Sequence, residues 1–285
     1  MSLFYLEGLH IRVQHSKILS KRKMLRRIST CTKSKIVVLN KFYQRNLSIS
    51  QKMADLNLKD HRTAYKDRSA GLNDEVVSKW NCPYEVFAEW MSDASKKVDE
   101  YNAMTIASVN KHGFPSARMV LLKEVKADQG FIFFTNYGSR KAQEIDSNPN
   151  VALVFYWAAL NRSVRIEGKA ERIPAAESED YFRSRPKASQ IGSAVSPQSQ
   201  IVKSRDWLWD RNDDFEKKDE IEMPNWGGYC VKPHWIEFWQ GQSNRLHDRV
   251  VFSTGQFDRE KDFTENDEFT ISKTSSGWQR ARLAP

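Results

Sequence analysis

Short strand-like runs separated by turn residues fill much of the chain, and this pattern restricts the possible folds more than any other feature. Seven such runs occur, at 103–109, 117–123, 130–135, 151–157, 163–169, 227–239 and 245–253. Turn-forming residues at 110–113 and 148–150 separate some of them. Many short strands with few helices between them predict an antiparallel barrel, not a doubly wound parallel sheet.

Helices are predicted at the periphery of this sheet, so the expected fold class is mainly β with added helices. In the run 81–97, Pro83 suits a first turn, and Phe87 and Trp90 have helical spacing. Three further helices are expected, at 139–147, 175–184 and 203–222. The segment 255–277 has the polar composition of a loop.

The net charge of +9 is concentrated at the N-terminus. Residues 1–52 contain twelve Lys and Arg and a single acid, Glu7, so they carry +11 and the rest of the chain carries −2. The charge of the body therefore does not indicate a nucleic-acid-binding domain. The basic segment fits a mitochondrial transit peptide, a disordered tail, or an upstream extension of the gene model with Met53 as the functional start. We expect an extension, 1–52, followed by one domain, 53–285.

Several kinds of site are not expected because their motifs are missing. The three cysteines lie far apart, and there is no HExxH motif or His/Cys cluster, so the sequence predicts no protein metal site. The odd cysteine count indicates a reducing compartment, either the cytosol or the mitochondrial matrix. No apolar run approaches the roughly 20 residues that span a bilayer. The glycine-rich nucleotide signatures and the GxSxG hydrolase motif are also missing.

Two cations stand at an unfavourable position in the predicted helix 139–147. Ser139 can cap this helix, which places Arg140 and Lys141 in a first turn where they oppose the helix dipole. A phosphate bound at the helix N-terminus would explain the placement. The alternative is that both side chains are long, exposed and directed away from the dipole.

A similar group of cations lies in the predicted strand 245–253. Strand alternation would place Arg245, His247 and Arg249 on one face, where an anion could separate their charges. A solvated edge compensated by nearby acids is the alternative.

Cations also accompany an aromatic ring and a predicted strand. Tyr181 and Arg185 are four residues apart and would meet on one helix face before Pro186 ends the helix. Arg118 and Lys123 would point to opposite faces of the strand 117–123. Together these elements suggest a site for phosphorylated ligands with planar rings.

Motifs along about 60–285 resemble the pyridoxamine 5′-phosphate oxidase family in order and spacing. They are SARMVLLK (116–123), FFTNYGSRKAQEIDSNP (133–149), VFYWAALNRSVRIEG (154–168), YFRSRPKASQIG (181–192), VSPQS (195–199), EFWQGQSNRLHDR (237–249) and the terminal RLAP. The resemblance implies an FMN-binding split β-barrel that works as a homodimer, with FMN in a cleft between subunits. It also implies oxidation of pyridoxamine or pyridoxine 5′-phosphate to pyridoxal 5′-phosphate, with dioxygen as acceptor and hydrogen peroxide as product.

The resemblance further implies roles for individual residues. Those expected to contact FMN are Arg118, Met119, Val120, Leu121, Phe134, Thr135, Arg140, Lys141, Ser163, Gln198, Ser199, Trp239 and Arg249. Those expected to bind the substrate are Lys123, Tyr181, Arg185, Ser189, Arg245, Leu246, His247, Arg62 and Tyr65. Among these, Arg245 and His247 are expected over the pyridine ring as catalytic residues, and Arg62 and Tyr65 in a segment that closes over the site.

One residue departs from the family pattern. Ser163 stands where family members commonly have a Gln that contacts the flavin, and the loss of one neutral hydrogen bond costs roughly 0.5–1.5 kcal/mol. We therefore expect weaker FMN binding than a Gln would give. The competing functions are a nicotinamide-dependent flavin reductase on the same barrel and a non-enzymatic carrier of FMN or pyridoxal phosphate.

Overall fold

The computed structural model describes residues 71–127, 129–243, 245–255 and 271–285. The expectations for 1–52, for Arg62 and Tyr65, and for most of 255–277 lie outside these residues. The helices are α3 (Asp74–Ser78), α4 (Pro83–Ser95), α5 (Arg140–Ser147), η1 (Ala158–Leu160), α6 (Ala175–Ser184), α7 (Lys187–Val195) and α8 (Arg205–Glu216). The strands are β1 (Ala103–Val109), β2 (Pro115–Leu121), β3 (Glu124–Lys126), β4 (Gly130–Asn136), β5 (Asn150–Trp157), β6 (Arg162–Arg172), β7 (Trp226–Gln240), β8 (Asp248–Ser253), β9 (Ser272–Lys273) and β10 (Gln279–Leu283).

The long strand β7 organises an antiparallel sheet. The strand order is β2-β1-β5-β6-β7-β8-β10-β9, and β4 joins β7 while β3 joins β4. One edge of β7 pairs with β6, whereas the opposite edge pairs first with β4, at 226–231, and then with β8, at 235–240. Pro233 lies between these two stretches and has no N–H to donate to a ladder. As a result, β4 and β8 leave the same edge of β7 at different levels.

A glycine makes the close approach of β6 and β7 possible near this point. The register of the two strands shifts between Glu167 and Gly168. A Cβ atom at Gly168 would stand 2.3 Å from the carbonyl oxygen of Lys232, which no side chain could accept without moving the backbone. The sequence therefore needs a glycine at the bulge that bends β7.

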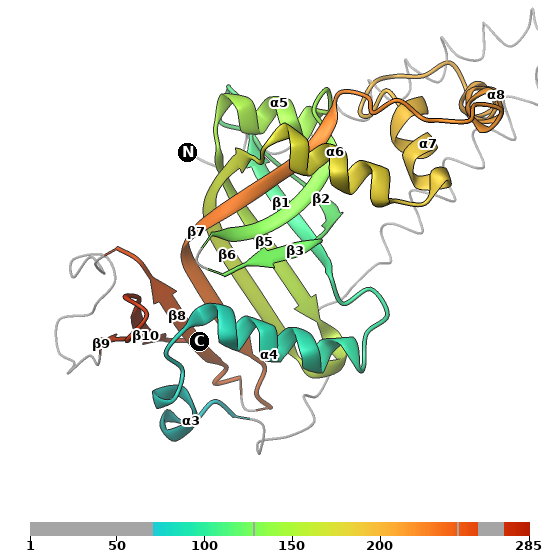
Figure 1. Cartoon of the computed structure of the whole chain (residues 1–285). Helices are drawn as coiled ribbons and strands as arrows, with labels where there is room; N and C mark the ends of the chain where they lie inside the picture. The colour runs from blue at the N-terminus through green and yellow to red at the C-terminus, as the bar shows by residue number, and fades with distance from the viewer. Residues whose placement is uncertain (1–70, 128, 244, 256–270) are drawn as a thin grey trace, which may run out of the picture. The chain divides into compact units, whose positions relative to one another are not determined.

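The main core lies between α4 and the sheet. Phe87 and Trp90 on the inner face of α4 are almost fully buried. The Phe87 ring centroid lies 5.0 Å from that of Phe131 and 5.2 Å from that of Phe155, while Trp90 meets Phe238 at 5.2 Å. Such aromatic pairs add about 0.5–1.5 kcal/mol each beyond the burial of their area. Figure 1 shows α4 across one end of the strands, with α5 and α6 at the other end.

A second, smaller core fixes α6 and α7 beside the start of β7. It consists of Phe182, Ile191, Val195, Ile221 and Trp226, all buried. Because Trp226 begins β7, this cluster ties the helical segment to the central strand. It thereby sets the position of the loop between α6 and α7 relative to β4.

Most predicted elements agree with the structure to within a few residues. The expected helix 81–97 is α4, with Pro83 in its first turn, and Ser139 accepts a hydrogen bond from the backbone N–H of Ala142 as the cap of α5. The expected charged helix at 203–222 is the shorter α8. No helix in the described part of the chain is both long and apolar enough to cross a membrane.

The prediction for 245–253 is wrong in its first three residues. The strand β8 begins only at Asp248, whose partner in β7 is Gln240. Arg245 has a φ of 64°, so it lies in a turn and not in a strand. The imidazole Nδ1 of His247 accepts a hydrogen bond from the backbone N–H of Gln242 at 3.0 Å. This local bond shapes a loop, and strand alternation therefore does not place Arg245, His247 and Arg249 on one face.

Two other residues lie just outside the elements predicted for them. Arg185 is not in the last turn of α6, which ends at Ser184, because the following Pro186 holds residue 185 in an extended conformation. Lys123 lies two residues beyond the end of β2, so its direction does not follow from strand alternation.

Candidate functional site

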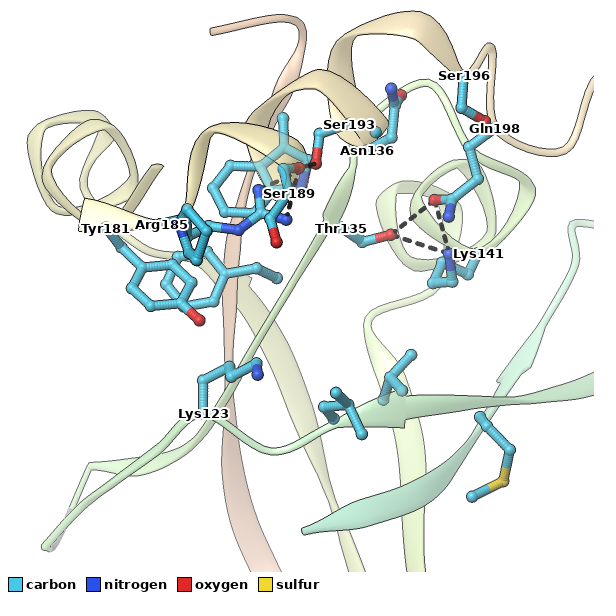
Figure 2. A pocket seen from close by; sticks show the side chains of 17 residues that line it. Lys123, Thr135, Asn136, Lys141, Tyr181, Arg185, Ser189, Ser193, Ser196 and Gln198 are labelled. Atoms are coloured by element: carbon cyan, nitrogen blue, oxygen red, sulfur yellow. Dashed lines mark hydrogen bonds between the residues drawn. The ribbon is translucent and has the colours of Figure 1, made fainter. Parts of the chain in front are cut away.

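A cavity with polar and apolar walls opens between β2, β4, α5 and the α6–α7 segment. Its volume is about 510 Å³. Figure 2 shows the side chains that line it, which are Met119, Val120, Leu121, Lys123, Phe134, Thr135, Asn136, Lys141, Tyr181, Arg185, Pro186, Ser189, Ser193, Ser196, Gln198 and Trp226, together with Gly192. This lining includes three cations, Lys123, Lys141 and Arg185, and contains no Asp or Glu. Such a charge balance favours an anionic ligand.

Lys141 forms the first cationic end of the cavity. The residue is 7% exposed, and its Nζ donates to Thr135 Oγ1 at 2.9 Å and to Gln198 Oε1 at 3.0 Å. No carboxylate within the described residues forms a salt bridge with it. Burial, together with the neighbouring charge of Arg118, lowers the pKa of Lys141 to about 8. A buried ammonium that lacks a counter-ion beside the N-terminus of α5 is suited to hold a phosphate.

Arg185 forms the second cationic end. Its guanidinium carbon lies 4.7 Å from the centroid of the Trp226 ring, and its Nη1 donates to Ser193 Oγ at 2.9 Å. Burial lowers the pKa of Arg185 from its usual value. Arg185 has no carboxylate partner in the part of the chain that the structure describes. A second anion could therefore bind here, next to aromatic rings.

Aromatic and aliphatic groups surround the space between the two ends. The ring of Tyr181 lies 4.1 Å from that of Phe134, which stacks in turn on Trp226 at 5.1 Å. In Figure 2, Lys123 lies beneath Tyr181 and Arg185, while Thr135, Lys141 and Gln198 form a separate group. The cavity could thus accept a ligand, or two ligands, with planar rings and two separated phosphates.

Two of the arginines expected at FMN stand beside the cavity and do not line it. Arg118 and Arg140 both bind the buried carboxylate of Glu144, at 3.0 Å and 2.8 Å. Glu144 was not predicted from the sequence. Only its position four residues after Arg140, within reach on a helix, could have suggested the contact.

Three other predicted site residues form a second group on this chain. Ser163 pairs with Trp239, and Trp239 pairs with Arg249, across neighbouring strands. Ser163 Oγ donates to the carbonyl oxygen of Phe155 at 2.9 Å, and Arg249 Nε donates to Glu237 at 2.7 Å. None of these three strand residues lines the 510 Å³ cavity.

The turn before β8 belongs to this second group. Leu246 and His247 line another cavity, of about 770 Å³, beside α3 and the C-terminal strand. The His247 ring lies 4.9 Å from the Trp239 ring, and Arg245 is exposed. Ser199, which has a φ of 74°, is also exposed and outside the first cavity. Within one chain, the predicted site residues are therefore divided between two places.

Several lining residues were not predicted. Ser193 could have been found because it follows Ser189 by four residues on α7 and so shares its face. Trp226 carried no such signal, because its contacts with Arg185 and Tyr181 join segments far apart in the sequence.

Most of the chain resembles one family of known proteins. The model of the family "Pyridoxamine 5′-phosphate oxidase" matches residues 91–219, and that of the "Pyridoxine 5′-phosphate oxidase C-terminal dimerisation region" matches residues 226–285. Pyridoxine-5′-phosphate oxidase from Bos taurus is 50% identical over 208 residues, which cover 71% of this chain and 79% of the relative. Pyridoxine/pyridoxamine 5′-phosphate oxidase from Bombyx mori is 41% identical over 262 residues, which cover 89% and 96%.

Solved structures give the same fold. PhzG from Burkholderia lata, in complex with tetrahydrophenazine-1-carboxylic acid, superposes with a TM-score of 0.63 at 24% identity and covers 76% of this chain and 98% of its own. A pyridoxamine 5′-phosphate oxidase-related, FMN binding protein from Nostoc punctiforme gives a TM-score of 0.53 at 16% identity and covers 71% and 98%. The two family models and the relatives at 41–50% identity, which span most of the sequence, show that the chain belongs to the pyridoxamine 5′-phosphate oxidase family.

Proposed function

We propose that this chain oxidises pyridoxine 5′-phosphate and pyridoxamine 5′-phosphate to pyridoxal 5′-phosphate with bound FMN as cofactor. The observation that carries the proposal is the buried ammonium of Lys141, which has no carboxylate partner within the described segments and lies at a helix N-terminus. FMN and the substrate each bring one phosphate. The cavity offers two cationic ends for them.

The FMN phosphate fits the Lys141 end. Lys141 Nζ and Thr135 Oγ1 already form a cluster with Gln198, so their donors are held in place before the phosphate arrives. Met119, Val120 and Leu121 on β2 would lie along the flavin. When bound, FMN would supply the redox chemistry, accepting a hydride equivalent from the substrate carbon and passing electrons to dioxygen to give hydrogen peroxide.

The substrate phosphate fits the Arg185 end. Lys123, Arg185, Ser189 and Tyr181 would bind it, and Trp226 would keep water from one side of the guanidinium. Since hydride transfer needs the reacting atoms about 3–3.5 Å apart, the role of these residues is to hold the pyridine ring in register with the flavin.

A homodimer would join the two groups of predicted site residues. The dimerisation-region model covers β7, β8 and β10, where Trp239 and Arg249 lie. We propose that Ser163, Ser199, Trp239 and Arg249 complete the FMN site and that Arg245, Leu246 and His247 complete the substrate site, across a subunit interface. The divergence of β4 and β8 from one edge of β7 supports a split barrel.

The N-terminal extension lies outside the proposed oxidase domain. We propose that residues 53–285 form the oxidase domain and that 1–52 contribute no site residue. Arg62 and Tyr65 would close over the substrate. The working compartment would be the cytosol or the mitochondrion.

Aerobic turnover tests the proposal. FMN-loaded protein is incubated with pyridoxine 5′-phosphate, while pyridoxal 5′-phosphate and peroxide are measured together, with unphosphorylated pyridoxine as the matched control. We expect both products in equal amounts from the phosphate ester and little from the control. Tight FMN binding without either product would instead favour a carrier of FMN or pyridoxal phosphate.

A further inference from the structure

Glu144 is a buried acid beside the cavity that Lys123, Lys141 and Arg185 line. Its side chain lies on α5, one turn after Arg140, and the residue is 4% exposed. Oε2 accepts hydrogen bonds from Ser108 Oγ at 2.6 Å, Ser116 Oγ at 2.7 Å and Arg118 Nη2 at 3.0 Å. Oε1 accepts one from Arg140 Nε at 2.8 Å.

These contacts keep the carboxylate charged. Burial alone would raise the pKa of Glu144, but hydrogen bonds from the two serines and the two arginines outweigh it and lower the pKa to about 2. Replacing such a buried ionic group by apolar residues is often neutral or favourable for stability. The fold therefore does not by itself explain why an acid occupies this position.

The arrangement of donors suggests a reason. Two hydrogen bonds fix the guanidinium of Arg118: its Nη1 donates to Ser108 Oγ at 2.5 Å, and its Nη2 donates to Glu144 Oε2 at 3.0 Å. Arg140 donates to Glu144 only through its Nε, and the Arg140 side chain is 61% exposed. Its two terminal nitrogens have no hydrogen-bond partner among the described residues and are free to bind a ligand.

The carboxylate also gathers three cations at one place. Arg118 lies close enough to Lys141 for its charge to lower the pKa of that ammonium. Without an acid, Arg118, Arg140 and Lys141 would repel one another before any anion bound. Because Glu144 contacts residues of β1, β2 and α5, it fixes the two arginines relative to the helix N-terminus.

We propose that Glu144 is a positioning residue for the cofactor phosphate: it anchors Arg118 and directs the free nitrogens of Arg140 toward the anion that Lys141 binds. This inference rests on the proposed use of FMN. Glu144 itself does not touch the cofactor, and it acts through the two arginines.

The substitution Glu144→Asp separates position from charge. It keeps the negative charge but shortens the side chain by one methylene, so one carboxylate can no longer reach both arginines. Dissociation constants for FMN and for riboflavin, which lacks the phosphate, are measured with apoprotein by quenching of flavin fluorescence. We expect FMN to bind about tenfold more weakly, the effect of one charge-assisted hydrogen bond at the low end of its range, and riboflavin to bind as before.

Two controls make the result specific. Glu171→Asp shortens an exposed acid that pairs with Lys232 and does not line the cavity, and it should change neither constant. In an Arg140→Ala background the effect of Glu144→Asp should shrink, because the residue through which it acts is missing. If the Asp variant does not fold, Glu144→Gln keeps the shape, and the same selective loss is expected because an amide nitrogen cannot accept from arginine.

The outcomes distinguish this inference from the proposed function. Failure of the unmodified apoprotein to bind FMN would refute the proposed function. If it binds FMN and the Asp variant binds FMN equally well or more tightly, the positioning role is wrong. Equal weakening of FMN and riboflavin would show that Glu144 only supports the fold.

Discussion

Lys141→Met should have opposite effects on the stability of the apoprotein and on cofactor binding. Burial and Arg118 lower the pKa of Lys141 from its ordinary 10.5 to about 8. At about 1.4 kcal/mol per pKa unit, keeping this ammonium charged at neutral pH costs the folded state on the order of 3 kcal/mol. Methionine has a similar length, and Thr135 Oγ1 can still donate to Gln198 Oε1 after the substitution.

The expected gain is measurable by thermal unfolding. A domain of this size shifts its Tm by roughly 2–4 °C for each kcal/mol, so the Met variant of the apoprotein should melt about 6–12 °C higher. FMN binding should weaken by about 10- to 150-fold, the effect of one lost charge-assisted bond. Lys123→Met is the matched control, because Lys123 lines the same cavity but is exposed, and its loss should leave the apoprotein Tm unchanged.

The same pKa shift predicts how the stability of the apoprotein depends on pH. Since the folded-state pKa of Lys141 is lowered, the folded protein loses this proton before the unfolded chain does. Below about pH 8 the folded state bears the whole free-energy cost of the charged Lys141 ammonium. As the pH rises from about 8 toward 10.5 this cost disappears, so Lys141 makes the free energy of unfolding increase across that range. The increase should be absent in Lys141→Met. A Met variant that melts lower than the unmodified apoprotein would refute the reasoning, because Lys141 would then stabilise the empty site.

Five other changes test the remaining assignments. Arg185→Ala should raise the KM for the phosphorylated substrate and lower kcat/KM by about 10- to 150-fold with FMN retained; loss of flavin at normal KM would mean that the two phosphate sites are exchanged. Arg249→Ala should lose FMN on gel filtration, whereas Arg245→Ala should keep it and slow anaerobic flavin reduction; equal flavin loss in both would contradict the separate roles. Ser163→Gln should tighten FMN binding by up to about tenfold in a fluorescence titration, and unchanged or weaker binding would contradict the expected flavin contact at this position. A chain that starts at Met53 should stay soluble and active, and insoluble protein would show that 1–52 support folding.

Local patterns in the sequence determined the elements and part of the site. Alternation and turn residues located the strands, and Ser139 located the start of α5 together with Lys141. These predictions succeeded because they depend on neighbours a few residues apart. They failed where a local bond or a proline intervened, as at His247 and Arg185.

The tertiary structure decided what the charged side chains do. Arg118 was predicted as a contact of FMN, and Arg140 as a partner of Lys141 at a phosphate. Both arginines are bound to Glu144, while Lys141 alone at that end has no carboxylate within the described residues. The sequence could not show this, because Arg118 reaches Glu144 only through the pairing of β1 with β2 and the packing of α5 against them. Spacing determines which residues share an element, but the partner of a buried charge depends on which elements meet.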